Sequence, residues 1–392
     1  MRRTEWLQET RMKRFEEALG AWTEQRLSQE EAAMLLGVCT RTFRRYIDRY
    51  EEAGLDGLRD QRLSQVSHRR APVDEVLRLV DRYRTRHAGW NVRHFHAWYR
   101  RSGGSRSYNW VRNTLQAAGA VKKGRRRGAH RKRRVRAPWP GMMLHQDAST
   151  HEWVPGQHWD LVVTMDDATN EHYSMFFCEE EGTASSYQGV REVIEAKGLF
   201  CSLYTDRGSH YWHTPKEGGK VDKGNLTQFG RALGQLGIEM IPAYSPQARG
   251  RSERAFRTHQ DRLVKELAQA GITDREAANA YIREHYLPAY NAEFASAPRE
   301  TGSAFVACQN PGVLEDILCE HHTRVVGKDN CVRFQRRILQ IPADRHRCHY
   351  MKVKVRVLRY PDGQLAIHHG PRELARYDAQ GQLLELHMKA AA

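Results

Sequence analysis

Three carboxylates have the residue type and the surroundings of a divalent-metal site. Asp147 ends the predicted strand "GMMLHQDAST", Asp206 ends the predicted strand "LFCSLYTDRGSHY", and Glu253 lies in the first turns of a predicted helix. If the two strands are neighbours in one sheet, both aspartates emerge at the same edge, and the helix can complete a triangle. Hard oxygen ligands of this kind suit Mg²⁺, which keeps water and phosphate oxygens as its remaining ligands. The pattern predicts metal-assisted phosphoryl transfer without a nucleotide cofactor, since no GxxxxGK[ST] loop is present.

Each carboxylate also has a structural interpretation when it is taken alone. Asp206 could form a turn beside an arginine, Asp147 could cap the turn "DAST", and Glu253 could be a salt-bridge partner for its neighbouring arginines. Asp166 and Asp167 are competing acids at the end of the second predicted strand. The joint fit of the three acids to one strand order favours the metal site.

Other metal-capable residues carry less weight. His145 lies two residues before Asp147, on the same strand face, and is expected to line the site without being a ligand. A second group contains zinc-capable residue types but lacks the paired spacing of tetrahedral sites. Its members are Cys319, His321, His322 and Cys331.

Strands and helices alternate around the carboxylates, in residues 139–275. Two further strands, "HWDLVVTMDDAT" and "EHYSMFFCEE", flank a turn at Thr169–Asn170. A helix ("TASSYQGVREVIEAKG"), a strand, a helix ("NLTQFGRALGQLG"), the strand "IEMIPAYSP" and a helix through about Ala270 follow. This order predicts an α/β domain with a mixed sheet that helices cover on both faces.

The N-terminal part, residues 1–65, has the pattern of a helix-turn-helix. Ser28 and Glu31 form a capping box, Gly37 allows a tight turn, and Thr40 can cap the next helix. The apolar positions expected to face inward are Ala32, Ala33, Leu35, Leu36, Phe43, Tyr46 and Ile47. Arg41, Arg44 and Arg45 then face outward, where a recognition helix contacts DNA. The alternative is an ordinary helical hairpin with a basic solvated face.

A second helix-turn-helix is predicted in residues 66–121. The segment "APVDEVLRLVDRYRTRH" has a helical apolar period, and "NVRHFHAWYRR" and "SRSYNWVRNTLQAAGAV" are two further helices. The inward positions of the first of these helices are Val76, Leu77, Val80 and Tyr83. Asn109, Arg112 and Asn113 are the candidate DNA-binding residues of the last helix, because their side chains suit base edges and phosphates.

Three further segments complete the predicted organisation. Residues 122–138 form a basic linker that can follow phosphates or enter a minor groove. Its candidate DNA-binding residues are Arg125, Arg126, Arg127, Arg131, Lys132 and Arg133. Residues 276–329 are expected to be a helical connector. Residues 330–392 contain period-two strands around a turn at Pro361-Asp362-Gly363 and predict a small β-barrel.

The composition favours a polyanionic partner. The 392 residues carry 63 Lys plus Arg against 47 Asp plus Glu, a formal charge of +16. No long apolar run or signal-peptide core is present, so neither a membrane partner nor a transmembrane helix is expected. The seven cysteines are scattered without paired spacing, which is typical of a reduced, cytoplasmic protein.

The segments "LHQDAST", "LYTDRGSHY" and "YSPQARGRSERAFRTHQDRL" resemble the three signature blocks of DDE transposases and retroviral-type integrases. The last block is similar to the S-P-Q-A-x-G-R-x-E-R pattern of bacterial insertion-sequence transposases. The resemblance implies a ribonuclease-H-like core, an SH3-like C-terminal domain, and Asp147, Asp206 and Glu253 as the catalytic, metal-binding triad. Its further implications are that Pro246 and Gly250 shape the loop before the helix and that three arginines meet DNA phosphates: Arg251, Arg254 and Arg257.

The sequence departs from this family in two places. The second spacing of the triad is longer than is common, with an apparent insertion at residues 211–225, and an N-terminal His/Cys zinc module is missing. Neither departure touches the three carboxylates.

The expected function is that of a DNA transposase. It would bind the terminal inverted repeats of its element, cleave the 3′ ends with Mg²⁺ or Mn²⁺, two ions per site, and join them to target DNA. Because two ends must be joined in concert, a homo-oligomer, at least a dimer, is expected on double-stranded DNA. The alternatives are a non-catalytic DNA-binding regulator derived from a transposase and a nuclease that cuts RNA in hybrids. The two helix-turn-helix units, which suit B-form grooves, disfavour the nuclease.

Overall fold

The computed structural model describes residues 3–60, 70–122, 135–215, 219–244, 250–343 and 347–384. The chain divides into two compact units, residues 1–81 and 82–392.

The first unit contains three helices: α1 (Arg3–Thr23), α2 (Gln29–Leu35) and α3 (Thr40–Gly57). Both bonds of the predicted capping box are present at Ser28, and Gly37 has a φ of 66°, which fits the tight turn. Phe43 and Ile47 are buried against Phe15 and Ala18 of α1, a helix that the sequence pattern did not reveal. The helix-turn-helix prediction therefore holds, with a third helix as its support.

Two details of this unit differ from the predictions. Leu35 was expected inside but is 57% exposed. This is because α2 ends at Leu35 and its buried face consists of Ala32 and Ala33. Thr40 was expected to cap α3, but Cys39 occupies the N-cap position and its side chain makes no capping bond.

Three helices follow: α4 (Val73–Arg86), α5 (Val92–Arg101) and α6 (Tyr108–Ala117). Asn91 and Ser107 cap α5 and α6 through side-chain oxygens that accept backbone amides. Tyr83 packs edge-on against Phe95, with ring centroids 5.1 Å apart. Val80 and Tyr83 are buried as predicted, but Leu77, also predicted to be inside, is 63% exposed, and Leu79 is buried in its place.

The centre of the second unit is a five-stranded mixed sheet. Its strands are β1 (Leu144–Val154), β2 (Gln157–Asp166), β3 (His172–Cys178), β4 (Ser202–Thr205) and β5 (Glu239–Pro242), in the order β3-β2-β1-β4-β5. The first three are antiparallel, whereas β4 pairs in parallel with β1 and with β5. Asp147 was predicted to end its strand, but β1 continues for seven residues beyond it and forms a long hairpin with β2.

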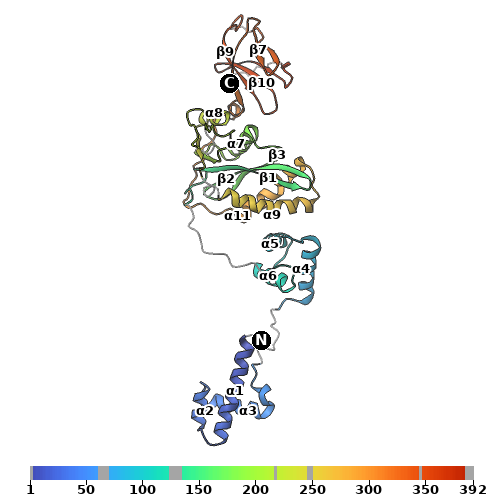
Figure 1. Ribbon diagram of the computed structural model, residues 1–392, viewed down its shortest axis with the longest axis vertical. Helices are drawn as coiled ribbons and strands as arrows, with labels where there is room; N and C mark the ends of the chain where they lie inside the picture. The colour runs from blue at the N-terminus through green and yellow to red at the C-terminus, as the bar shows by residue number, and fades with distance from the viewer. Residues whose placement is uncertain are drawn as a thin grey trace. The chain divides into compact units, whose positions relative to one another are not determined.

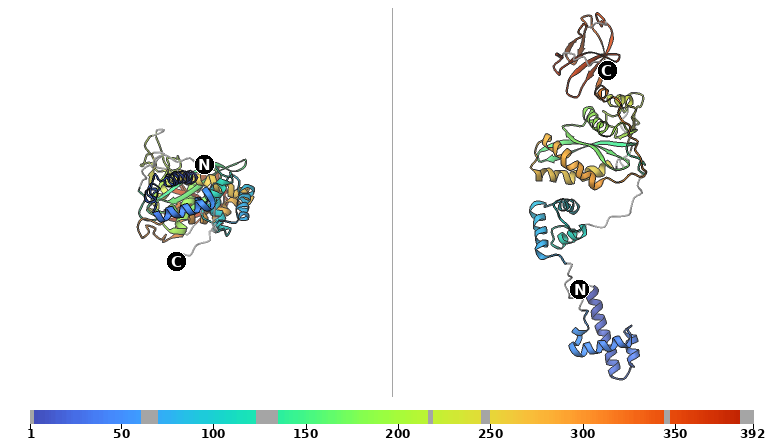
Figure 2. Two further views of the ribbon diagram at one scale, coloured as in Figure 1. Left: turned by 90° about the horizontal axis from the view of Figure 1, so that it is seen from below. Right: turned by 180° about the vertical axis from the view of Figure 1, so that it is seen from behind.

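Helices cover both faces of this sheet, as predicted (Figures 1 and 2). One face packs on α7 (Thr183–Lys197) and α8 (Gln228–Gln235), with Leu144 and Leu203 in that core. The other face packs on α9 (Ser252–Ala270), α10 (Arg275–Tyr281), η3 (Ile282–Tyr286) and α11 (Leu287–Phe294).

The predicted connector, residues 276–329, is therefore not one segment. Its helices through Phe294 belong to the core of the sheet domain, because Ile282, Tyr286 and Tyr290 are buried there. After η4 (Pro311–Val313) and α12 (Leu314–Ile317), its last part is the strand β6 (Glu320–Val325). Leu314 and Leu318 close the core on the α7 side.

The C-terminal strands form two sheets around one core. A five-stranded sheet contains β6, β9 (Lys354–Arg359), β10 (Leu365–His369), β11 (Arg372–Tyr377) and β12 (Leu383–Leu384), and a second sheet pairs β7 (Cys331–Phe334) with β8 (Arg337–Gln340). The predicted hairpin at Pro361-Asp362-Gly363 connects β9 with β10. Among the strands that the structure describes, no closed barrel forms, so the predicted barrel is not confirmed.

Candidate active site

Asp147 and Asp206 come together because of the register between β1 and β4. The parallel pairing aligns Leu144 with Leu203 and His145 with Tyr204, so the same offset aligns Asp147 with Asp206 directly after β4. His145 and Tyr204 touch on one face of the sheet, with ring centroids 5.1 Å apart. Because side chains alternate along a strand, both aspartates project from that same face.

Local hydrogen bonds orient the two carboxylates. Asp147 accepts the amide of Ala148 through Oδ1 at 3.0 Å, and Asp206 accepts the amide of Gly208 through Oδ1 at 2.8 Å. The second bond is a turn of the Asp-x-Gly type that follows the strand. Asp147 is only 6% exposed, so the pair is recessed in this face of the sheet and does not lie on an open surface.

Glu253 lies in the first turn of α9, the helix that covers this face of the sheet. Gln260, seven residues later on the same side of the helix, donates to Ser149 Oγ at 3.0 Å. Ser149 is two residues beyond Asp147 and shares its face of β1. The side of α9 that carries Glu253 therefore turns toward the strand that carries Asp147.

The register of β1 and β4 thus aligns the two aspartates, and Glu253, which is exposed, lies on the helix that covers the same face. Within the described ranges, no three His, Cys, Asp or Glu side chains are grouped closely enough to hold a metal ion. Pro246 lies in residues 245–249, which precede α9 and are outside the described part of the chain.

Arg251 fixes the beginning of α9 to the sheet. Its Nη1 pairs with Asp167 Oδ1 and donates to the Asp167 carbonyl at 3.0 Å. His145 Nε2 lies 2.7 Å from the same carboxylate. Burial by itself would raise the pKa of Asp167, but the bonds from His145 and from the Ala137 amide, with the nearby Arg251 charge, lower it. Asp167 is thus a buried anchor between β2 and α9.

Asp166, the other competing acid, is also used structurally. Its Oδ1 accepts the Gly141 amide at 2.9 Å, and its Oδ2 accepts the amide and the hydroxyl of Thr169 at 2.8 and 3.0 Å. Burial raises its pKa despite these bonds. Both carboxylates are fully buried and bonded to structural partners, so they do not compete with the three predicted metal ligands.

A buried polar network lies on the opposite face of β1. The Tyr211 hydroxyl lies 3.2 Å from Gln146 Oε1 and 3.2 Å from Glu181 Oε1, and Ser186 Oγ is 3.2 Å from it. Burial, with the charges of Glu181, Asp147 and Asp206, raises the pKa of Tyr211 well above its usual value. Tyr211, Trp212 and Val221 of the insertion at 211–225 are buried in the core, whereas residues 222–225 are exposed. The aromatic pair Tyr211-Trp212 was the signal for the buried part.

The predicted DNA-binding residues of the first unit lie on the surface. Arg41, Arg44 and Arg45 are exposed on α3, and Arg44 donates to Gln29 of α2 at 2.8 Å. This leaves one face of the second helix of the turn basic and accessible, as a recognition helix requires.

In the second unit, Asn109 and Asn113 are exposed on α6, whereas Arg112 is half-buried against Asn113 and the Tyr108 ring. Arg254 and Arg257 are exposed on α9, but Arg251 is held by Asp167 as described above. The linker residues Arg125, Arg126, Arg127, Arg131, Lys132 and Arg133 lie outside the described residues.

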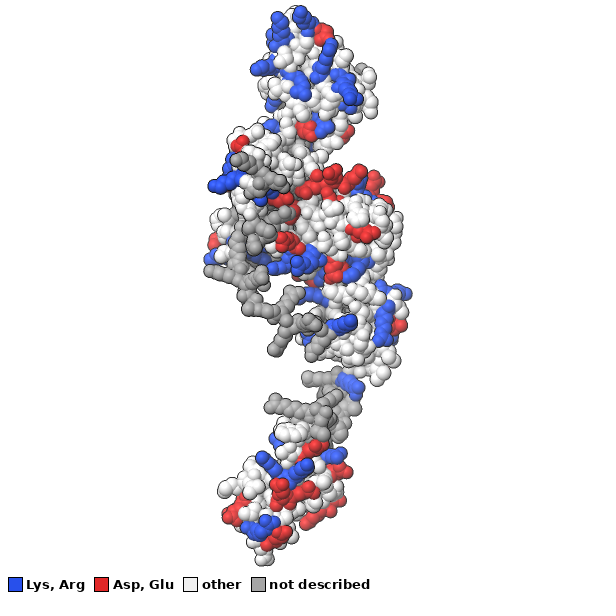
Figure 3. All heavy atoms as spheres, in the orientation of Figure 1, with Lys and Arg blue, Asp and Glu red and all other residues white. Residues whose placement is uncertain are grey.

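One basic surface was missed by the sequence analysis. Figure 3 shows Lys and Arg side chains spread over the C-terminal sheets. The exposed members are Arg324, Lys328, Arg333, Arg336, Lys352 and Lys354. The alternation of basic with apolar residues in "KVKVRV" was the available signal, because it turns the charges to the outer face of a strand.

The zinc-capable residues do not form a metal site. Cys319 is buried with its thiol at Asp316 O, and burial raises its pKa to about 12, which opposes the thiolate that zinc needs. His321 Nε2 is 2.7 Å from Asp316 O, and the Cys331 thiol contacts Gln340 instead.

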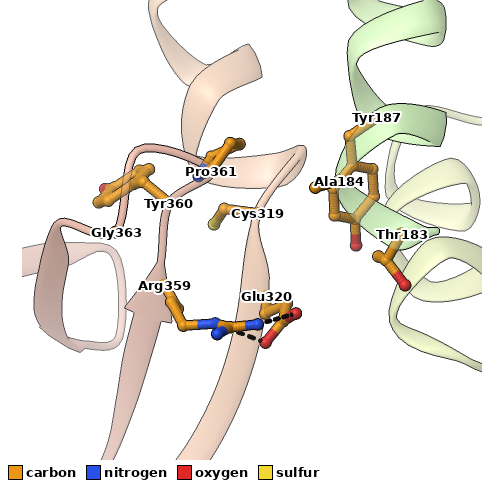
Figure 4. Close-up of a pocket in the computed structure, with 9 residues that line it drawn as sticks. All are labelled: Thr183, Ala184, Tyr187, Cys319, Glu320, Arg359, Tyr360, Pro361 and Gly363. Carbon is orange, nitrogen blue, oxygen red and sulfur yellow. Dashed lines mark hydrogen bonds and ion pairs between the residues drawn. The ribbon is translucent and has the colours of Figure 1, made fainter. Parts of the chain in front are cut away.

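A pocket of about 130 Å³ lies between α7 and the C-terminal sheet (Figure 4). The ion pair of Glu320 and Arg359 closes one side, with Arg359 Nε 2.9 Å from Glu320 Oε2. Thr183 and Tyr187 line the other side. None of the three predicted catalytic carboxylates lines it, so the pocket is separate from the candidate site.

Comparison with known proteins agrees with the first unit. The family model described as "Winged helix-turn helix" matches residues 22–72, which include α2 and α3. The prediction of a helix-turn-helix in this part of the chain is thereby confirmed.

Two curated relatives are both transposases. The chain is 28% identical over 358 residues to the "Putative transposase y4bF" of Sinorhizobium fredii (strain NBRC 101917 / NGR234), a match that covers 90% of this chain and 77% of that protein. It is 30% identical over 234 residues to the "Transposase for insertion sequence IS1202" of Streptococcus pneumoniae, covering 59% of this chain and 50% of that protein.

Solved structures with a related fold include viral integration complexes. A chain of the simian T-cell lymphotropic virus intasome with PP2A regulatory subunit B56 gamma has a TM-score of 0.33 and 13% identity, covering 74% of this chain and 91% of that chain. The HTLV-2 integrase catalytic core domain in complex with magnesium has a TM-score of 0.29 and 14% identity, covering 39% and 86%. Both scores are low, so the relationship to transposases stands on the curated relatives.

Taken together, the curated relatives and the family model confirm the relationship to transposases that the motifs predicted: the chain is related to insertion-sequence transposases, and it combines a helix-turn-helix with a five-stranded mixed sheet. None of its described helices is both long and apolar enough to cross a membrane.

Proposed function

We propose that the protein is a DNA transposase that binds the terminal inverted repeats of its element, cleaves their 3′ ends and transfers the strands into target DNA in the bacterial cytoplasm. The observation that carries this proposal is the register of β1 and β4, which sets Asp147 beside Asp206 on the face that α9 covers. Transposases are also the relatives over 90% of the chain.

The donor set fits a divalent metal. Asp147, Asp206 and Glu253 supply only hard carboxylate oxygens, the ligands that Mg²⁺ and Mn²⁺ prefer. When bound, a pair of such ions would activate the attacking water or 3′-hydroxyl and neutralise charge on the phosphate. The backbone bonds to Asp147 and Asp206 would hold these carboxylates in place, and Arg251, bound to Asp167, would hold the turn of α9 that carries Glu253.

DNA would contact several surfaces of the chain. The exposed Arg41, Arg44 and Arg45 of α3 would enter a major groove, and the exposed Asn109 and Asn113 of α6 would contact a second DNA segment. Arg254 follows Glu253 directly and Arg257 lies about one helical turn farther along α9, where both would meet the phosphates of the cleaved strand. The joining of two ends in one reaction implies at least two copies of the chain.

A strand-transfer assay tests the proposal. DNA from the two flanks of the gene is incubated with Mg²⁺ and either the wild type or Glu253→Gln, which removes one metal-binding charge at constant shape. We expect joined products from the wild type alone, with equal binding in a gel shift. Glu276→Gln, the same change at an exposed glutamate of α10, is the matched control and should keep activity.

Binding by both proteins without products from either would overturn the proposal and point to the DNA-binding regulator. Products from Glu253→Gln at the wild-type rate would leave transposition standing but remove Glu253 from the site.

A further inference from the structure

Two acidic residues of α9, Asp261 and Glu266, hold the helical segment with α5 and α6. Asn91 Nδ2 donates to Asp261 Oδ2, while Asn91 Oδ1 caps α5 by accepting the His94 amide at 2.8 Å. One side chain therefore sets both where α5 begins and where it meets α9.

One turn farther along, His94 Nε2 lies 2.6 Å from Glu266 Oε1. Both residues are buried, and the Trp90 ring stacks on the imidazole with centroids 3.8 Å apart. Tyr281 of α10 donates to the second oxygen of Glu266 at 2.8 Å. A buried carboxylate that is left without its hydrogen-bond partner costs a large desolvation free energy. The contact between His94 and Glu266 therefore opposes separation of α5 from α9.

Weaker contacts surround this pair. Arg101 Nη2 is 3.8 Å from Glu266, Arg93 Nε is 3.5 Å from Glu293, and Gln269 Nε2 is 3.3 Å from His87 Nε2. We use the term α9 latch for two pairs, Asn91 with Asp261 and His94 with Glu266.

We infer that the α9 latch holds the α5–α6 segment on the catalytic helix of the same chain and thereby fixes where DNA bound along α6 enters the active site. This inference rests on the proposed function. Glu253 and Glu266 are separated by 13 positions of one helix, or about 20 Å. That length corresponds to roughly six base pairs of B-DNA at the usual rise. A segment fixed to the far half of α9 would give the cleavage site a constant offset from the bound sequence.

The polar pair Asn91–Asp261 permits a reversal test. Asn91→Asp keeps a good N-cap for α5, since Asp and Asn cap equally well, but sets one carboxylate against another. The double variant Asn91→Asp/Asp261→Asn restores a donor opposite an acceptor with the roles exchanged. Asn310→Asp makes the same change at an exposed position and is the matched control.

Hydrogen exchange of the full-length protein, without DNA, reads the docking directly. We expect Asn91→Asp to speed exchange of the α5 amides by about tenfold, and the double variant and the control to remain within about twofold of the wild type. Unchanged exchange in Asn91→Asp, no recovery in the double variant, or protection that vanishes on dilution would overturn the inference. The last result would mean that the segment docks on a second copy.

The position at which the DNA is cleaved tests the consequence of this docking for the active site. On flank DNA with Mg²⁺, Asn91→Asp should scatter the cut positions while gel-shift binding is kept, and the double variant should restore a single position. A single unchanged position in an undocked variant would overturn the role in positioning. Because exchange requires no catalysis, a protein without transposase activity would still reveal whether the latch exists.

Discussion

Four aspartates within or next to three neighbouring strands, β2, β1 and β4, differ in what surrounds them. Asp166 and Asp167 are fully buried, with several structural partners each, whereas Asp147 and Asp206 project from the face under α9. Carboxylates that fix loops and carboxylates that would bind a metal should therefore respond differently to removal of charge.

Asp206→Asn and Asp166→Asn separate these two roles. We expect Asp206→Asn to lower metal-dependent cleavage by about a thousandfold or more, with a free energy of unfolding equal to or above that of the wild type, because it relieves repulsion between adjacent carboxylates. Asp166→Asn replaces a carboxylate that accepts three hydrogen bonds with an amide, and it should lower the free energy of unfolding by about 1–3 kcal/mol. Urea denaturation and a cleavage assay measure both; equal destabilisation by the two changes would contradict this assignment.

Two buried histidines, His172 of β3 and His259 of α9, form a neutral hydrogen-bonded pair. His172 Nδ1 donates to Asn170 O at 3.0 Å, so its Nε2 accepts from His259 Nε2 at 3.1 Å. His259 Nδ1 then accepts from the Tyr286 hydroxyl at 3.0 Å. Burial lowers the pKa of His172 to about 4 and that of His259 well below its usual value.

The low pKa values of these two buried histidines predict that the protein loses stability in mild acid. Above the unfolded pKa near 6.5, both states are neutral and pH has no effect through these groups. As pH falls from about 6.5 toward about 4, only the unfolded state gains protons, so stability falls, by about 1–3 kcal/mol. Urea midpoints between pH 7.5 and 4.5 test this: His172→Asn should weaken the dependence, and His213→Asn, at an exposed histidine, should keep it.

At the scale of elements, α7 packs very closely on the sheet at one residue. A Cβ at Gly189 would collide with the Gln146 amide and stand 3.0 Å from Thr164 Oγ1. Gln146 in turn donates to Thr164 and to Ser186 O, so the absence of a side chain at 189 makes room for a buried polar link between helix and strand.

Gly189→Ala should therefore destabilise the protein by about 1–3 kcal/mol, because overpacking here also breaks hydrogen bonds. Gly234→Ala in α8 is the matched control, since a Cβ there meets no atom within 4 Å. It should stabilise by up to about 1 kcal/mol through helix propensity. Thermal or urea unfolding of the two variants decides; a neutral Gly189→Ala would show that Gln146 can move aside.

For the whole molecule, charge is distributed over several surfaces rather than one. The excess of +16 lies largely in residues 122–138 and in the C-terminal sheets, whereas the basic and acidic residues of α3 balance, although its arginines share an exposed face. Contacts with phosphates at separate places add to one salt dependence, because each neutralised phosphate releases counterions.

Substituting Arg324, Arg333 and Arg336 together by Gln should reduce the slope of log affinity against log salt by up to about 3. The same three positions changed to Lys keep the charge and should keep the slope. Fluorescence anisotropy with duplex DNA at salt concentrations between about 50 and about 300 mM measures the slope. An unchanged slope in the Gln variant would exclude the C-terminal sheets from DNA contact.

The sequence by itself determined most of the local elements and the residue types of the candidate site. Capping at Ser28, the turn at Gly37 and the alternation in "KVKVRV" are local signals, and each predicted its element without knowledge of distant contacts. The types and sequence surroundings of Asp147, Asp206 and Glu253 are likewise local, and they predicted a candidate metal site. The motifs around the three acids predicted the transposase relationship that the curated relatives confirm.

Only the tertiary structure decided how these parts meet. That β1 extends past Asp147, that Asp166 and Asp167 are anchors, that residues 275–294 belong to the core and that α5 rests on α9 all depend on contacts between residues far apart in the chain. Periodicity gives the face of a helix or strand but not its partner, and burial of polar groups becomes favourable only where a distant donor or acceptor satisfies them.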